Sequence, residues 1–509
     1  MNINVTIKKL LTYASFKLDL QNWDLIYIQN RLLDILELDS YEDTEIDEKE
    51  IKELKVPDIL IKELEDYLLA LGKSNKEVEL TITKIMGVIS PLPSAVLSKF
   101  LMLEKQNSQS ALDYLYQLQI FNNYIQHTAV SKNKYWRADF EDNFLEITIN
   151  LSKPEKKNSD IAKLIGKTDV SYPKCLLCSE NLGYAGRANH PSRVNIRTIP
   201  LHLNDEEWFM QYSPYVYYHE HCIVILNNHE PMMMGRRIFT SLLEFVKRFP
   251  TFFIGSNSEL PIVGGSILNH EHFQGGGHKM PMMYASPLLE IESKKYRNCK
   301  IEYLNWYNSV IKITSTSVNS IIDLGEEIYN AWTNYTDEEN DIIAFTDKKH
   351  NTVTPIATKE GKEYSLYLIL RNNRCNDEHP DGIFHAHKEY HNFKSEGIGL
   401  IEAMGMFILP ARLDRQIREL AVLLNDDKFD IDTYFESHQD LEIHRSMITK
   451  LHQNLGKSVS IDDGVEYIKC EINKACKGIL GNVAVFKVDK ENLEPLNRFI
   501  KYLKDKGVI

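Results

Sequence analysis

The sequence predicts an α+β fold, with antiparallel sheets between helical N-terminal and C-terminal regions. In the first 130 residues Leu and Ile recur at three- and four-residue steps, as at Leu60, Leu64 and Leu68, which indicates amphipathic helices. Residues 193–265 and 352–409 are rich in strand patterns, and helical periodicity returns after Ala411. Because the strands come in runs and seldom alternate with helices, antiparallel pairing is favoured over a parallel sheet.

In chain order these elements divide the sequence into three segments. Residues 1–140 form a helical region, residues 141–340 a first strand-rich unit, and residues 341–509 a second strand-rich unit with a helical tail. The first unit has a helix at 236–248, and the second has a hairpin that turns at Gly361. Each unit carries one His-x-His, HEH at 270–272 and HAH at 385–387, which leaves a duplication of one unit as an open alternative.

Composition excludes several classes of protein. The 509 residues include 59 Lys and Arg against 72 Asp and Glu, a net charge of −13, which argues against bulk nucleic-acid binding. No apolar run approaches the roughly 20 residues that span a bilayer, and the sequence does not open with the apolar core of a signal peptide. We therefore expect a cytoplasmic protein with reduced thiols, in which clustered cysteines are metal ligands rather than disulfides.

The most informative stretch is GGSILNHEHFQGGGHKMPMM at 264–283. In an extended backbone the side chains of His270, His272 and Gln274 project from one face, while Phe273 packs behind them. A lone histidine on a strand is usually structural. Two histidines and a glutamine at a spacing of two, flanked by glycines on both sides, predict a functional site instead.

This residue set suits phosphoryl chemistry. Gly275, Gly276 and Gly277 leave backbone N–H groups able to approach a phosphate. A neutral imidazole is a good nucleophile near pH 7, and a backbone carbonyl that accepts from its other ring nitrogen would fix the required tautomer. Gln274 offers an amide donor to a phosphoryl oxygen. The stretch therefore predicts nucleotidyl transfer through a covalent histidine.

Two further clusters resemble metal sites. Cys175 and Cys178 form C-x2-C, which is half of a tetrahedral zinc site or, alternatively, two unrelated buried thiols. His385 and His387, with His350 as a third candidate, could bind one metal ion, or could mark a polar strand at a subunit contact. The candidates for the missing zinc ligands are His190, His202, His219, His221, His229 and His270.

HEHFQ at 270–274 resembles the His-x-His-x-Gln signature of the galactose-1-phosphate uridylyltransferases, a branch of the histidine-triad superfamily. The long helical N-terminal region, ITINLSKPEK at 147–156, GGSILNHEHFQGG at 264–276 and HNTVTPIA at 350–357 are similar to the type 2 branch known from bacteria. The resemblance covers most of the chain. It implies histidine-triad-like antiparallel units, and a two-step exchange in which UDP-glucose gives UMP to the enzyme and galactose 1-phosphate takes it.

The resemblance also implies roles for individual residues, here named by their positions in this chain. His272 would be the nucleophile and Gln274 would contact the transferred phosphoryl group. The implied zinc ligands are Cys175, Cys178, His229 and His270. The implied ligands of a second metal are Glu290 or Glu292, His350, His385 and His387. The candidate substrate-binding residues are Arg193, Asn195, Arg197, Gly275, Gly276 and Gly277. The family also implies a homodimer.

Some features depart from the type 1 pattern. Leu268-Asn269 and Glu271 stand where type 1 has prolines around the motif, and Glu271 should point away from the nucleophile's face. Two alternatives remain. One is a dinucleotide phosphorylase or a histidine-triad hydrolase, although the hydrolases usually have a third His where this chain has Gln274. The other is a zinc-stabilised binding protein without activity, which the intact motif argues against.

Overall fold

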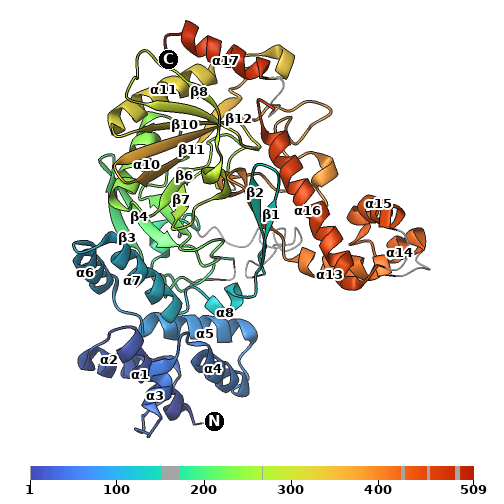
Figure 1. Cartoon of the computed structure of the whole chain (residues 1–509). Helices are drawn as coiled ribbons and strands as arrows, with labels where there is room; N and C mark the ends of the chain where they lie inside the picture. The colour runs from blue at the N-terminus through green and yellow to red at the C-terminus, as the bar shows by residue number, and fades with distance from the viewer. Residues whose placement is uncertain are drawn as a thin grey trace. The chain divides into compact units, whose positions relative to one another are not determined.

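The computed structural model describes residues 2–151, 172–187, 189–265, 267–425, 430–455, 459–487 and 493–509 (Figure 1). Residues 152–156 of the ITINLSKPEK segment lie outside that range. The chain forms two compact units, one of Met1–Lys132 and Lys156–Glu230, the other of Asn133–Glu155 and Pro231–Ile509. This division differs from the three consecutive segments that the sequence suggests, because strands from both sides of residue 340 pair within the second unit.

The first unit begins with the predicted helical region. Its helices are α1 (Ile3–Lys17), α2 (Asn22–Ile35), α3 (Glu48–Glu53), α4 (Asp58–Ala70), α5 (Asn75–Val88), α6 (Pro93–Glu104), α7 (Ser108–Phe121) and α8 (His127–Val130). Leu60, Leu64 and Leu68 are the buried residues of α4, which confirms the period seen in the sequence. Helix α5 begins with a capping box, in which the Ser74 N–H donates to the Glu77 carboxylate at 2.8 Å.

The same unit contains the strands β3 (Ile199–Leu203), β4 (Glu206–Tyr212) and β5 (Cys222–Leu226), paired antiparallel in that order. The side chains of β3 alternate between buried and exposed, as expected for a strand with one face in the core. Strands were predicted across 193–265, and β3, β4 and β5 confirm part of this prediction. Residues 193–198 and 213–221 are instead irregular chain and turns, and residues 261–265 form a turn and no strand.

The second unit is built on antiparallel strands that follow one another in the order β7-β6-β11-β12-β10-β9-β8. Their bounds are β6 (Phe253–Ser256), β7 (His272–Gly276), β8 (Pro287–Ile291), β9 (Lys300–Leu304), β10 (Val310–Ser315), β11 (Asn351–Glu360) and β12 (Glu363–Asn372). Strands β11 and β12 form the predicted hairpin. Gly361 turns it with a φ of +56°, which favours glycine.

Helices α10 (Arg236–Arg248) and α11 (Val318–Thr333) pack on these strands (Figure 1). The bounds of α10 are those predicted from the sequence. A Cβ on Gly325 of α11 would lie 2.8 Å from Leu366 of β12, so Leu366 faces the helices. Because side chains alternate along a strand, Ile369 and Arg371 face the opposite side of the sheet.

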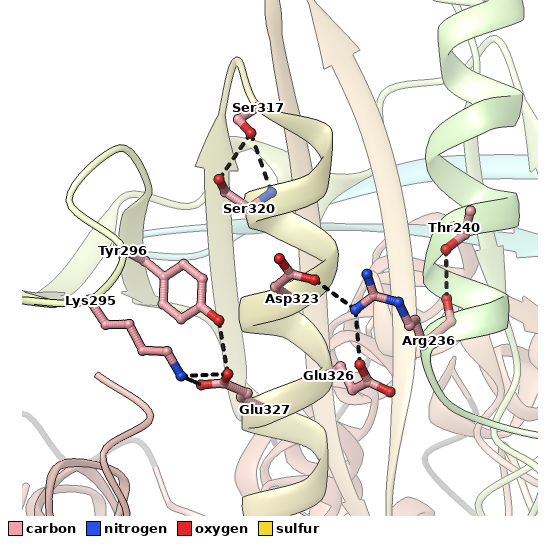
Figure 2. A network of polar contacts seen from close by, with 9 residues as sticks. All are labelled: Arg236, Thr240, Lys295, Tyr296, Ser317, Ser320, Asp323, Glu326 and Glu327. Carbon is pink, nitrogen blue, oxygen red and sulfur yellow. Dashed lines mark hydrogen bonds and ion pairs between the residues drawn. The ribbon is translucent and has the colours of Figure 1, made fainter.

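Exposed ion pairs connect α10 to α11, and connect α11 to the segment between β8 and β9 (Figure 2). The Arg236 guanidinium of α10 donates to Asp323 at 2.7 Å and to Glu326 at 3.0 Å, both on α11. Glu327 of α11 accepts from Lys295 at 2.6 Å. Such exposed ion pairs contribute about 0–1 kcal/mol each, so buried apolar packing supplies most of the stability here.

A smaller sheet in the second unit has the order β1-β2-β13. Strand β1 (Lys134–Asp139) runs antiparallel to β2 (Phe144–Ile149), and β13 (Met406–Leu409) runs parallel to β2. The helical tail is confirmed, and the long helix α16 packs along α13 (Figure 1). The helices of the C-terminal region are α12 (Leu400–Ala403), α13 (Arg412–Asn425), α14 (Ile431–Ser437), α15 (Arg445–Leu455), α16 (Ile461–Val483) and α17 (Glu494–Asp505).

The predicted α+β class is therefore confirmed, with helices at both ends and antiparallel strands between them. In the part of the chain that the structure describes, no single helix is long and apolar enough to cross a bilayer; α5 and α6 pass that test only together, as a pair bent by 54°. A duplication of one strand-rich unit, suggested by the two His-x-His motifs, stays an open alternative.

Candidate active site and metal centre

The predicted motif lies on β7, at the end of the run of strands in the second unit. Gln274 stands opposite Gly255 of β6, and Phe273 stands opposite Ser256. His272 and Gln274 are two apart on this strand and share a face, as predicted. His270 precedes the strand, because β7 begins at His272. The extended segment is thus shorter than the sequence suggests.

His272 is buried, and its ring orientation is fixed by the backbone. Its Nδ1 lies 2.8 Å from the carbonyl oxygen of His270. A carbonyl can only accept, so Nδ1 carries the hydrogen and Nε2 keeps its lone pair. Burial lowers the pKa of His272 below its usual range, against the opposing effect of this hydrogen bond. The result is a neutral imidazole with a nucleophilic Nε2.

Glu271 points to the other face of the motif strand. Its carboxylate, which is almost fully buried, accepts from Arg237 Nη1 of α10 at 2.5 Å. This confirms the expectation that Glu271 faces away from His272. Arg237 was not predicted; the only available signal was a basic pair, Arg236-Arg237, opening a helix beside the strand that carries the motif.

The glycines after the motif take part in, or directly follow, the pairing of β7 with β6. Gly275 and Gly276 belong to β7, opposite Ile254 and Phe253 of β6. A Cβ on Gly275 would lie 2.3 Å from the Phe253 carbonyl oxygen, so only glycine fits. Gly277 follows the strand. Their predicted role as a phosphate cradle stays a prediction.

Three of the four predicted zinc ligands lie together in the first unit. Cys175 Sγ and Cys178 Sγ are 3.5 Å apart, and Cys178 Sγ is 3.1 Å from His229 Nδ1. A tetrahedral zinc with bonds of about 2.0–2.3 Å separates its ligand atoms by about 3.3–3.8 Å. The distance between the two thiols falls in that range, and the distance from Cys178 to His229 is slightly below it. Burial, followed by the hydrogen bond to Cys175, raises the pKa of the Cys178 thiol to about 12, so a thiolate there needs a cation beside it.

A polar side chain missed by the sequence reasoning holds the Cys-x2-Cys turn. The Asn181 amide donates to the carbonyls of Cys175 and Cys178 at 2.9 Å and 2.8 Å. Its oxygen accepts from His190 Nε2 at 2.6 Å. His190 was a candidate zinc ligand and instead orients the turn that presents the two thiols.

The full set of candidate metal ligands is Cys175, Cys178, His229 and His270. His270 belongs to the second unit, where it immediately precedes the motif strand. Two thiols and two imidazoles are a donor set that zinc favours, so the residues present are compatible with zinc.

The candidate substrate-binding residues before β3 have structural contacts in the first unit. Asn195 exchanges amide–carbonyl hydrogen bonds with Asn122, at 3.0 Å and 2.6 Å. Arg197 is buried and donates to the carbonyls of Gly87, Ser90, Pro91, Val194 and Ile196. It thereby caps the C-terminal end of α5. Arg193 donates its backbone N–H to Tyr184 and is half-buried.

We expect Arg197→Met to lower the free energy of unfolding by about 3 kcal/mol or more, because it leaves several buried carbonyls without a donor. Chemical denaturation measures this. The KM for UDP-glucose of the folded variant should stay near the wild-type value. A KM raised about tenfold with unchanged stability would instead support the predicted substrate contact.

The residues of the predicted second metal site are not brought together in the described part of the chain. Glu290 lies on the exposed strand β8 and pairs with Lys300 at 3.2 Å. His350 uses both ring nitrogens, with Thr346 and Asn373 at 2.7 Å and 2.8 Å. His387 Nε2 lies 3.0 Å from the carbonyl oxygen of Ile383. His385 is buried elsewhere in the same unit.

Comparison with known proteins identifies the family. Residues 19–231 match the model of the galactose-1-phosphate uridyl transferase N-terminal domain, and residues 245–440 match that of the C-terminal domain. The chain is 40% identical over 507 residues to the galactose-1-phosphate uridylyltransferase of Caldanaerobacter subterraneus subsp. tengcongensis, covering 97% of both chains. The Halalkalibacterium halodurans protein of the same name is 40% identical and covers 99% of both chains.

The Bacillus subtilis galactose-1-phosphate uridylyltransferase is 38% identical over 515 residues, covering 100% of this chain and 99% of its own. Among solved structures, the crystal structure of yeast Ap4A phosphorylase Apa2 matches 56% of this chain and 81% of its own, with 10% identity and a TM-score of 0.31. The chain belongs to the galactose-1-phosphate uridylyltransferase family.

Proposed function

We propose that this chain transfers UMP from UDP-glucose to galactose 1-phosphate, giving glucose 1-phosphate and UDP-galactose. The relatives' names supply the acceptor, galactose 1-phosphate, and the transferred uridylyl group, and the family resemblance implies UDP-glucose as the donor. The single observation that carries the mechanism is the hydrogen bond between His272 Nδ1 and the His270 carbonyl, which leaves Nε2 as the nucleophile on a buried, neutral ring.

In the first step His272 Nε2 attacks the α-phosphorus of UDP-glucose, and the phosphoanhydride bond breaks as glucose 1-phosphate leaves with the electron pair. In the second step a phosphate oxygen of galactose 1-phosphate attacks the same phosphorus, the P–N bond breaks, and the imidazole regains its lone pair. Gln274, on the same face of β7, donates its amide hydrogen to a non-bridging oxygen without adding charge.

We also propose that the bound metal is zinc, held by Cys175, Cys178 and His229, with His270 as the fourth ligand that the sequence predicts. The metal's role is structural, because four protein ligands leave no open position for substrate. A homodimer and a cytoplasmic location stay predictions. Light scattering of the purified chain would measure its oligomeric state.

Incubation with UDP-glucose labelled at the α-phosphorus tests the activity directly. Label that stays on the denatured protein supports a covalent transferase. Release of labelled UMP without galactose 1-phosphate would favour the histidine-triad hydrolase, and no reaction would favour a binding protein.

The covalent step also predicts ping-pong kinetics. Because glucose 1-phosphate leaves before galactose 1-phosphate binds, double-reciprocal plots of initial rate at several fixed co-substrate concentrations should be parallel. Intersecting lines would indicate a ternary complex and would contradict a uridylyl-His272 intermediate.

A further inference from the structure

The face of the sheet that carries His272 and Gln274 continues across the neighbouring strands. Gln274 stands opposite Gly255, which stands opposite Ile356 of β11. Further along β11, on the same face by the two-residue alternation, Thr352 stands opposite Arg371 of β12. Arg371 therefore lies on the motif's face of the sheet, opposite the side covered by α10 and α11.

Arg371 is fully buried, and most of its hydrogen-bond donors are unused. Its Nη2 donates to the Ile398 carbonyl at 2.8 Å. No described residue accepts from its Nε or Nη1, although both atoms are shielded from solvent. Burial lowers the pKa of Arg371 to about 10, so the guanidinium is still charged at neutral pH. A buried cation with open donors is costly unless an acceptor meets it.

His385 lies beside the same end of β12. The Ile383 N–H donates to the Arg374 carbonyl at 2.9 Å, which holds this segment against the strand. His385 is 4% exposed, and its buried ring nitrogens make no well-formed hydrogen bond to a described residue, apart from a minor contribution from the backbone of Ala386. Burial, and then the charge of Arg371, lower the pKa of His385 to about 4, so the ring is neutral and offers one N–H donor.

Charged side chains of both signs lie around these two residues. Lys394 donates to Glu402 at 3.0 Å, and both side chains are buried. Glu402 is also a carboxylate that acts on Arg371, so the two buried cations share this buried anion, while the more exposed carboxylate of Glu396 lies 3.8 Å from Lys394 Nζ. A hydroxyl on the same face of the sheet, Thr354 Oγ1, is buried and has no described partner.

We propose that Arg371 and His385 hold a small oxyanion of the phosphate class, on the motif's face of the sheet. The group that fits must accept from several N–H donors and carry negative charge, which an oxyanion does. A metal ion at His385 is disfavoured, because the guanidinium beside it repels a cation. Water would accept hydrogen bonds from the same atoms, but it would supply no negative charge to the buried guanidinium.

Thermal unfolding of the full chain with added inorganic phosphate tests this proposal. The purified chain is first dialysed into a buffer without oxyanions, and any released anion is measured by ion chromatography after denaturation. We expect either phosphate or sulfate to be released, or the unfolding midpoint to rise with added phosphate. The wild-type chain showing neither would overturn the proposal and leave water as the occupant.

Matched variants locate the effect. Arg371→Met keeps the side-chain length without the donors and should weaken phosphate binding at least about tenfold, the loss expected for a charge-assisted hydrogen bond. Arg236→Met removes an exposed guanidinium on α10 and should leave phosphate binding unchanged. His385→Phe provides a second variant if Arg371→Met does not fold. Equal phosphate binding in both site variants and the wild type would contradict the proposal.

The phosphate could be free or could belong to a hexose 1-phosphate. A raised KM for galactose 1-phosphate in Arg371→Met, with an unchanged KM for UDP-glucose, would identify the substrate as its source. Unchanged kinetics with lost phosphate binding would identify a resident free anion. Both outcomes support the site. Because phosphate binding needs no turnover, the proposal can fail while the transferase activity stands, and the reverse also holds.

Discussion

His272→Gly should lower the rate of uridylyl transfer by at least about 10⁴-fold, because it removes the nucleophile. The backbone pairing of β7 with β6 does not involve the ring, so the strand should keep its place. Binding of UDP-glucose, measured by calorimetry, should survive with a similar Kd. The vacated space is about the size of imidazole. Added imidazole should therefore attack UDP-glucose and form uridylyl-imidazole, detectable by phosphorus NMR.

Two further histidines serve as controls for this result. His278→Gln removes another imidazole from the same segment, one that lies beyond β7 and contacts Glu146 at 2.7 Å, and it should leave transfer largely intact. His270→Gly should damage the metal centre and should not be rescued by imidazole. Near-normal transfer by His272→Gly would mean that the nucleophile lies elsewhere, with His278 the next residue to test.

The sequence predicted those parts of the fold that depend on local pattern. The leucine period of α4, the helix α10 and the hairpin turning at Gly361 are set by short-range periodicity and turn chemistry, and all three are confirmed. The strands β8 to β10 and the helix α11 were missed. The division of the chain into two compact units also depends on long-range strand pairing, such as that of β12 with β10, and local periodicity does not encode such pairing.

The candidate site also has features that the sequence predicted and features that it could not predict. The shared face of His272 and Gln274 follows from strand geometry, and the structure agrees with it. Glu271 points away and a backbone carbonyl fixes the His272 tautomer, both as expected, although Glu271 and His270 lie before β7. Arg197 could not be placed from the sequence, because its role depends on the end of α5, about a hundred residues earlier. His385 was read as a metal ligand because the buried Arg371 beside it is invisible in a local motif.

The second large effect is expected at the metal centre. Cys178→Ser should lower zinc affinity at least about a hundredfold, because the neutral hydroxyl is a far weaker ligand than the thiolate. Zinc content, measured by elemental analysis, should fall from one ion per chain to well below that. The thermal midpoint and the activity should fall together, because the Cys175–Cys178 turn depends on the ion and on Asn181 to keep its shape.

Cys476→Ser is the matched control for this change. Cys476 is as deeply buried as Cys178 but lies on α16 and is not among the candidate ligands. The same atomic replacement there should cost stability through the buried hydroxyl alone, while zinc content stays at the wild-type value. Equal zinc content in both variants, or full activity in wild-type protein shown to be free of zinc, would contradict the site. A loss confined to Cys178→Ser separates metal binding from the general cost of burying a hydroxyl.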